Sequence, residues 1–147
     1  MKVSILFVLV LLLFYPKNLM AEANSKNICS LKDRLFVQQV NDIHLNPQNY
    51  QDKVIQIEGF FGKYIDEKKV ERYSVYRRTA GCCGYDGSVG FEFVYKKGKL
   101  SFKEDEWIYV EAHIAKSKDI IYDYDRIYLD AISVVPKEKG KAKEFVN

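Results

Sequence analysis

Five segments in which apolar and polar residues alternate limit the fold of this chain more than any other feature. Successive side chains of a β-strand point to opposite faces, so this alternation predicts strands with one buried face. The predicted strands are Lys53–Tyr64, Val70–Arg78, Val89–Tyr95, Trp107–Lys116 and Arg126–Val135. Gly59, inside the first strand, suggests a bulge or a sharp bend of the kind that small barrels require.

One amphipathic helix is predicted ahead of these strands. Ser30 has the character of a helix N-cap, with Asp33 three residues later, and the helix should fade near residues 41–42. Its apolar stripe consists of Leu31, Leu35, Phe36, Val40 and Ile43. We therefore expect an all-β fold with one N-terminal helix that covers an open end. A small five-stranded barrel of the oligonucleotide/oligosaccharide-binding (OB) type fits best, and an open β-sandwich is the alternative.

The N-terminus has the pattern of a secretory signal peptide. Lys2 precedes an apolar run over residues 3–15, and small residues follow at Ala21 and Ala23. The run is shorter than the roughly 20 residues of a membrane span. We expect a signal peptide over 1–23, an OB-like barrel domain with its helix over 24–136, and a lysine-rich C-terminal tail over 137–147 that is mobile from Lys137 to Lys143. The mature protein would be secreted or periplasmic, and an uncleaved anchor is the alternative.

The charge pattern argues against nucleic acid as a partner. The formal net charge is only +3, and lysines and acids are interspersed without a basic stripe. Tyrosines are plentiful, and they either cover a strand-rich surface or stack on a ligand. The acids that lie among them, which oppose phosphate binding, are Glu92, Glu111, Asp123 and Asp125.

The strongest candidate site is the Cys82-Cys83 pair, in a loop predicted over Thr79–Ser88. Glycine flanks the pair on both sides, and Asp86 follows three residues after Cys83. Cysteines of an exported protein pair, bind metal or react. Neighbouring side chains of an extended segment point opposite ways, so a bond between Cys82 and Cys83 would be strained.

Four interpretations of the cysteines remain open. In the first, Cys29 forms a disulfide with Cys82 or Cys83. In the second, Cys82, Cys83 and Asp86 bind Zn²⁺ or Cu⁺, since thiolates suit both ions. The third is a redox-active thiol pair, although the usual redox spacing is Cys-x-x-Cys, and the fourth is inert cysteine.

Two further residue types bear on this site. Arg77 or Arg78, on the neighbouring strand, would lower the pKa of the thiols if they bind metal. His44 and His113 are the chain's two histidines, and each is more typical of a surface histidine than of a ligand. No third group that would activate a Cys/His pair is evident, so no enzymatic activity is predicted.

One ordered set of residues also points to a family. It consists of Asp42-Ile43, Asn46-Pro47, Tyr50, Lys53, residues 55–60, Arg77/Arg78, Cys82-Cys83, Asp86, Gly90 and Trp107. This set resembles the C-terminal soluble domain of the YcgQ-like bacterial family, from about Asp42 to Phe145-Val146. Members of that family are regarded as permease subunits of unknown function. The resemblance implies a domain outside the cytoplasmic membrane, beside a permease-like envelope protein, with metal handling as one role.

The combined expectation is therefore an exported, non-catalytic binding domain. It would handle zinc or copper, or contact an envelope permease, through the Cys-Cys loop. The alternative is a disulfide-stapled OB-like module that binds a peptide, a glycan or nucleic acid.

Overall fold

The computed structural model describes residues 27–66, 69–81, 84–119 and 124–146. The predicted signal peptide lies outside these residues and stays a prediction. Within the described part of the chain, no helix has both the length and the apolar character needed to cross a membrane.

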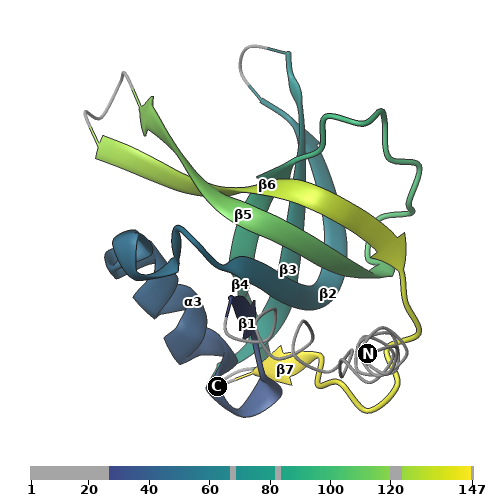
Figure 1. Ribbon diagram of the computed structural model, residues 1–147. Coiled ribbons are helices and arrows are strands. Elements are labelled where there is room, and N and C mark those ends of the chain that lie inside the picture. Colours follow the sequence, from purple (N-terminus) through teal and green to yellow (C-terminus); the bar gives the residue numbers. More distant parts are fainter. Residues whose placement is uncertain (1–26, 67–68, 82–83, 120–123, 147) are drawn as a thin grey trace, which may run out of the picture.

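Five strands close into a small barrel (Figure 1). They are β2 (Val54–Ile65), β3 (Glu71–Gly81), β4 (Gly84–Val94), β5 (Trp107–Asp119) and β6 (Tyr124–Pro136). Their order is β2-β3-β4-β6-β5, and β5 pairs back onto β2. The four strands that come first in the chain, β2 to β5, therefore lie in the spatial order β5-β2-β3-β4. This is the Greek-key order found in OB-like barrels. The predicted all-β, five-stranded barrel with one helix is confirmed.

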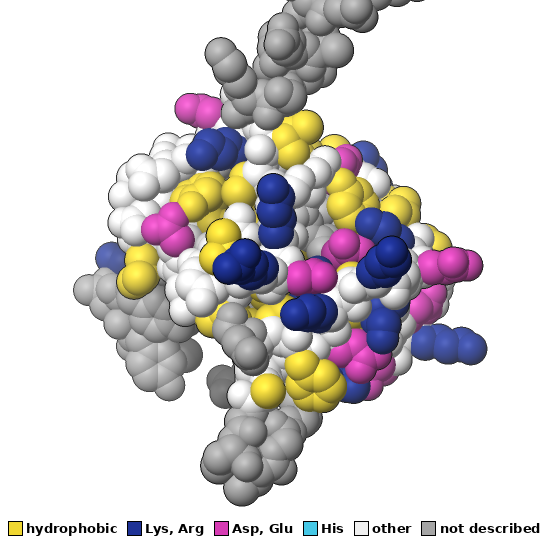
Figure 2. Space-filling model, turned by 90° about the horizontal axis from the view of Figure 1, so that it is seen from below, with side chains coloured by type: hydrophobic (Ala, Val, Ile, Leu, Met, Phe, Trp, Pro, Cys, Tyr) yellow, Lys and Arg dark blue, Asp and Glu magenta, His cyan; other side chains and the backbone are white. Residues whose placement is uncertain are grey.

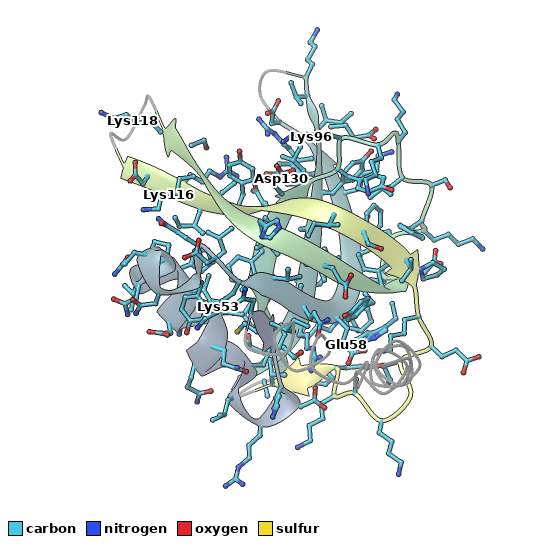
Figure 3. All side chains as sticks on the ribbon, viewed as in Figure 1. Lys53, Glu58, Lys96, Lys116, Lys118 and Asp130 are labelled. Carbon is cyan, nitrogen blue, oxygen red and sulfur yellow. The ribbon has the colours of Figure 1, made fainter. Side chains whose placement is uncertain are left out.

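The pairing between β4 and β6 is the shortest between neighbouring strands of the barrel. These two strands run parallel and pair only through Phe93 with Leu129 and Val94 with Asp130. The Lys96 ammonium lies 2.5 Å from the Asp130 carboxylate, so an ion pair bridges the two strands at the same point (Figure 3). β5 and β6 continue past the barrel as a paired arm that carries Lys116 and Lys118 (Figure 3).

The predicted apolar faces of the strands form the core. Phe61 lies at its centre, with ring centroids 5.5–5.6 Å from Tyr73 and from Phe102 of the β4–β5 connection. The inward-facing residues that are buried include Ile55, Ile57, Tyr73, Val75, Phe91, Phe93, Ile108, Val110 and Ala112. Alternation in the sequence therefore predicts most of the barrel interior correctly.

The helix begins later than predicted. Ser30 ends a short strand, β1 (Ile28–Ser30), that pairs with β2, and its hydroxyl donates to the Gln56 side chain at 2.5 Å. A 3-10 turn, η1 (Asp33–Leu35), follows, and α3 runs over Phe36–Leu45. The prediction of a cap at Ser30 is wrong, because Ser30 belongs to a strand paired with β2, and the Asp33 carboxylate accepts from the buried Arg77.

The end of α3 is tied to the turn that follows it. The Asp42 carboxylate accepts hydrogen bonds from the Asn46 amide at 2.8 Å and from the Tyr50 hydroxyl. The Lys53 ammonium lies 4.8 Å from the centre of the Tyr50 ring. Tyr50 belongs to a second 3-10 turn, η2 (Pro47–Tyr50). Asp42, Asn46, Tyr50 and Lys53, which belong to the residue set that resembles the YcgQ-like family, thus have a structural role at the junction of α3 and β2.

Gly59 marks the place where β2 changes partners. β2 pairs with β5 up to Phe60 and with β3 from Phe60 onward. A Cβ atom at Gly59 would lie 2.4 Å from the Tyr76 carbonyl oxygen. The glycine is therefore needed for a close approach of two backbones, which is the other common reason for glycine in a strand.

The lysine-rich tail is held against the barrel. Phe145–Val146 form a short strand, β7, that pairs in parallel with Arg78 and Thr79 of β3. Val146 is buried, and the Arg78 amide donates to the Glu144 carbonyl at 3.0 Å. An apolar pair at the end of the tail thus adds a strand to the sheet, whereas the mobility predicted for Lys137–Lys143 stays a prediction.

Candidate functional site

The predicted Thr79–Ser88 loop is mostly strand. β3 continues to Gly81 and β4 begins at Gly84, and these two glycines pair with each other beyond a bulge at Thr79/Ala80. Small residues in this segment hide the side-chain alternation, although the backbone ladder continues. Cys82 and Cys83 lie outside the described residues, and so does the side chain of Asp86, which belongs to β4. Their predicted role as metal ligands stays a prediction.

Arg77 and Arg78, the predicted supporting residues, make contacts with acids and aromatic rings. Arg77 is fully buried and donates to the Glu58 carbonyl at 2.9 Å and to the Asp33 carboxylate. Its guanidinium carbon lies 4.5 Å from the centre of the Phe36 ring. Arg78 lies over Phe60 and pairs with Asp105 at 3.2 Å. The prediction that one of them lowers the pKa of the thiols stays untested.

Asp33 connects three parts of the chain. Its carboxylate accepts from Arg77 of β3 and, at 3.2 Å, from the backbone amide of Lys143 in the tail. Partial burial acts to raise the pKa of Asp33, but the hydrogen bond and charge of Arg77 outweigh it and hold that pKa below its usual value. The Arg77–Asp33 pair thus joins η1, the turn before α3, and the tail to the barrel.

Cys29, the predicted disulfide partner, is half-buried in β1 and has no disulfide partner among the described residues. Burial raises the pKa of the Cys29 thiol, although the nearby Lys53 charge opposes this. Its pairing with Cys82 or Cys83 stays a prediction, because the other two cysteines lie outside the described residues.

Among the described residues, neither histidine belongs to a metal cluster. The His44 ring stacks on Phe91 with centroids 4.7 Å apart, and burial lowers the pKa of His44 although a hydrogen bond with the Gly90 backbone opposes this. His113 is exposed on β5. In the part of the chain that the structure describes, no group of three or more His, Cys, Asp or Glu side chains is placed to hold a metal ion.

A groove on the outer side of the barrel is the clearest site among the described residues. Three adjoining depressions over β2, β3, β4 and β6 all include Glu92. We call their union the Glu92 groove. Its lining includes Gly62, Lys63, Tyr64, Arg72, Ser74, Tyr76, Gly90, Glu92, Glu104, Asp125 and Arg126.

Strand register builds the floor of this groove. Gly62, Ser74 and Glu92 pair in one row across β2, β3 and β4, and Tyr76 pairs with Gly90 in the next row. A Cβ at Gly62 would lie 2.3 Å from the Ser74 hydroxyl. Gly62 therefore leaves room for the Ser74 and Tyr76 side chains close to the β2 backbone, whereas Gly90 lets the backbones of β3 and β4 approach closely.

A hydrogen-bonded group of three side chains lies in the groove. The Glu92 carboxylate accepts from the Tyr64 hydroxyl and from the Arg126 guanidinium, which also donates to the Tyr64 oxygen at 3.3 Å. Partial burial and the bond to Glu92 raise the pKa of Tyr64, so its phenol keeps its proton. All three side chains remain partly exposed, with 40% of Tyr64 accessible. They present an aromatic face, an acceptor and a donor at one place.

The positive charges of the groove are balanced by acids of the same chain. The Lys63 ammonium lies 2.8 Å from the Glu71 carboxylate, and the Arg72 guanidinium lies 2.9 Å from that of Asp66. Arg126 is paired with Glu92, and Glu104 and Asp125 add negative charge. The groove therefore suits a ligand that carries many hydroxyl groups better than one that carries many phosphates.

Sequence reasoning noted Glu92 and the tyrosines but did not find the groove. Tyr64, Glu92 and Arg126 come from three strands and lie up to 62 residues apart in the chain. Only the strand order brings them together. The available signal was indirect: two glycines within strands, at Gly62 and Gly90, mark positions where backbones or ligands approach closely.

Comparison with known proteins gives one family. The DUF1980 C-terminal domain matches residues 15–140. A comparison with curated proteins finds no match. Because the match covers most of the 147 residues, the chain belongs to the DUF1980 C-terminal domain family.

Proposed function

We propose that this chain is a non-catalytic binding domain that takes an oligosaccharide in the Glu92 groove. The domain works outside the cytoplasm, and its resemblance to the YcgQ-like family supports a permease-like envelope protein as its neighbour. The observation that carries the proposal is the grouping of Tyr64, Glu92 and Arg126 in one groove.

Position and chemistry together favour a glycan. OB-like barrels bind oligonucleotides and oligosaccharides on the face of their second and third strands, which here are β3 and β4. The ion-paired cations of the groove disfavour an oligonucleotide, because phosphate binding needs uncompensated positive charge. A tyrosine ring can instead stack on a sugar ring, and a carboxylate–guanidinium pair can form hydrogen bonds with the sugar's hydroxyl groups. Since the groove in front of β3 is mostly polar or glycine, it offers little that would hold the apolar side chains of a peptide.

A Glu92→Gln variant tests the proposal. We expect the chain to bind at least one of chitohexaose, cellohexaose and maltohexaose by calorimetry, and the variant to bind about tenfold more weakly. Loss of a hydrogen bond to a charged group accounts for a change of that size. Glu111→Gln is the matched control, because Glu111 bonds Gln56 and Tyr109 on the outer face of β2 and β5. Binding of an oligonucleotide instead of a sugar would contradict the glycan assignment. So would equal sugar affinities of the Glu92→Gln and Glu111→Gln variants.

Metal binding by the cysteine pair is a second candidate function. Its support is that Gly81 and Gly84 pair, so Cys82 and Cys83 are the only residues between two joined strand ends. Two adjacent thiols in so short a segment support joint binding of Zn²⁺ or Cu⁺, ions that thiolate ligands suit.

A zinc titration of the reduced protein tests this candidate. We expect one zinc ion per chain or per dimer, with binding lost in a Cys82→Ser/Cys83→Ser variant because thiolates are the strongest ligands available. Cys29→Ser is the control and should bind as the unaltered protein does. Zinc binding that survives the double substitution would rule out the cysteine pair as the site.

A further inference from the structure

The net charge of the chain is concentrated at one end of the barrel. Residues 32–34 and 137–145 hold six lysines and arginines and three acids, which equals the net charge of +3 of the whole sequence. The rest of the chain is therefore balanced. Two of the six cations are paired, Lys137 with Glu58 and Lys139 with Glu144. The other four are Lys32, Arg34, Lys141 and Lys143, and among the described residues none of them forms an ion pair.

These two segments form one surface. The Asp33 carboxylate accepts from the Lys143 backbone amide at 3.2 Å, which places η1 beside the tail. The anchoring of β7 on β3 fixes the tail at this end of the barrel (Figure 1). Figure 2, which looks onto this end, shows lysine and arginine side chains with hydrophobic side chains between them and some acids among them. We call this surface the basic end.

Large apolar side chains are exposed within the basic end. Leu35 follows Arg34 directly and is 51% exposed, and Phe145 of β7 is 43% exposed. Exposed leucine and phenylalanine surrounded by lysine and arginine are the composition of a surface that lies in the interface of a membrane. A partner that offered only negative charge would leave this apolar area without a role.

We propose that the basic end docks on the surface of a bilayer that contains anionic phospholipid. Lys32, Arg34, Lys141 and Lys143 meet the headgroups, and Leu35 and Phe145 enter the boundary between headgroups and acyl chains. Each basic residue near such a surface strengthens binding by about fivefold. The Glu92 groove lies on the side of the barrel and stays open to ligand in this arrangement.

Vesicle co-sedimentation of the full chain tests the proposal. We compare vesicles of phosphatidylcholine with vesicles that contain about one-third phosphatidylglycerol, at low and high salt. We expect the partition coefficient on anionic vesicles to exceed that on neutral vesicles by at least about tenfold and to fall in high salt, because exposed charges are screened. A Lys141→Glu/Lys143→Glu variant should lose most of this preference, and Leu35→Ser should weaken binding to anionic vesicles at both salt concentrations.

The matched control is Lys99→Glu/Lys103→Glu. These exposed lysines belong to the β4–β5 connection, which lies away from β7 (Figure 1). Every variant contains the apolar run of residues 3–15, so only differences between variants and between vesicle compositions count. The proposal is overturned if neutral and anionic vesicles bind equally, or if both lysine pairs have the same effect. If soluble polyglutamate displaces the protein from anionic vesicles and Leu35→Ser does not change vesicle binding, the basic end is a general polyanion site and not a lipid-binding surface.

Discussion

Replacing Asp33 with alanine is expected to lower the free energy of unfolding by about 3–5 kcal/mol, more than replacing its partner Arg77 with methionine. The reason is the unequal burial of the pair: the Arg77 side chain is 0% exposed, whereas that of Asp33 is 32% exposed. Without Asp33, a buried guanidinium that cannot lose its proton has no counter-charge. Without Arg77, the remaining carboxylate is reached by water.

The environment of Arg77 makes this asymmetry stronger. One guanidinium nitrogen donates to Glu58, a second donates to Asp33, and the third, Nη2, is buried without a hydrogen-bond partner among the described residues. The guanidinium carbon lies 4.5 Å from the centre of the Phe36 ring and 5.3 Å from that of the Trp107 ring, so an apolar side chain suits the same surroundings. An Asp33→Ala/Arg77→Met double variant should therefore regain much of the stability that Asp33→Ala loses.

Urea unfolding followed by the fluorescence of Trp107, the chain's one tryptophan, measures these differences. The control is Glu71→Ala, which removes an exposed carboxylate that is paired with Lys63 and accepts from the Tyr73 hydroxyl, and it should cost much less than Asp33→Ala. If Asp33→Ala lowers the free energy of unfolding no more than Glu71→Ala does, the Arg77–Asp33 pair does not hold η1 and the tail to the barrel.

The pH dependence of stability gives the same pair a second signature. The pKa of Asp33 is lower in the folded protein than in the unfolded chain. Its contribution is therefore fully present above the unfolded pKa of about 4 and is lost as the pH falls toward the folded value. Variants without Asp33 lack this component of acid sensitivity.

The sequence predicts what depends on local pattern and misses what depends on strand pairing. Alternation places Ile55, Val75 and Val110 correctly in the core, because one buried face imposes period two whatever the partner strand is. The capping signal at Ser30 fails because residues 28–30 pair with the non-local strand β2, so the helix begins further along the chain. A propensity for a helix start is worth about 1 kcal/mol and yields to such pairing.

The tail and the groove show the same limit. No periodic pattern precedes Phe145-Val146, yet two residues suffice to extend β3, since backbone hydrogen bonds do not depend on the side chain. The Glu92 groove needs the strand order, because Tyr64 and Arg126 become neighbours only when the barrel closes. The sequence therefore supports the fold class well and the site poorly.

Replacing Gly90 with alanine is expected to destabilise the protein by about 3 kcal/mol, the upper part of the range for overpacked sites. A Cβ at Gly90 would lie 2.1 Å from the Val75 carbonyl oxygen and 2.7 Å from the Tyr76 Cα. Both are backbone atoms of β3, and β3 cannot retreat because β2 pairs with it on its other side. The midpoint of thermal unfolding should fall by roughly 10 °C.

Gly87→Ala is the matched control in the same strand. There the nearest atom to the added Cβ is the Thr79 side-chain hydroxyl at 3.1 Å, which can rotate away, and the loss of freedom in the unfolded chain offsets part of the cost. We expect its unfolding midpoint to change by less than about 2 °C. Because Gly90 lines the Glu92 groove, separation of β3 from β4 should also weaken sugar binding in Gly90→Ala but not in Gly87→Ala. Equal midpoints for the two variants would show that the strands can separate at Gly90 at little cost, and the groove floor would then not depend on this glycine.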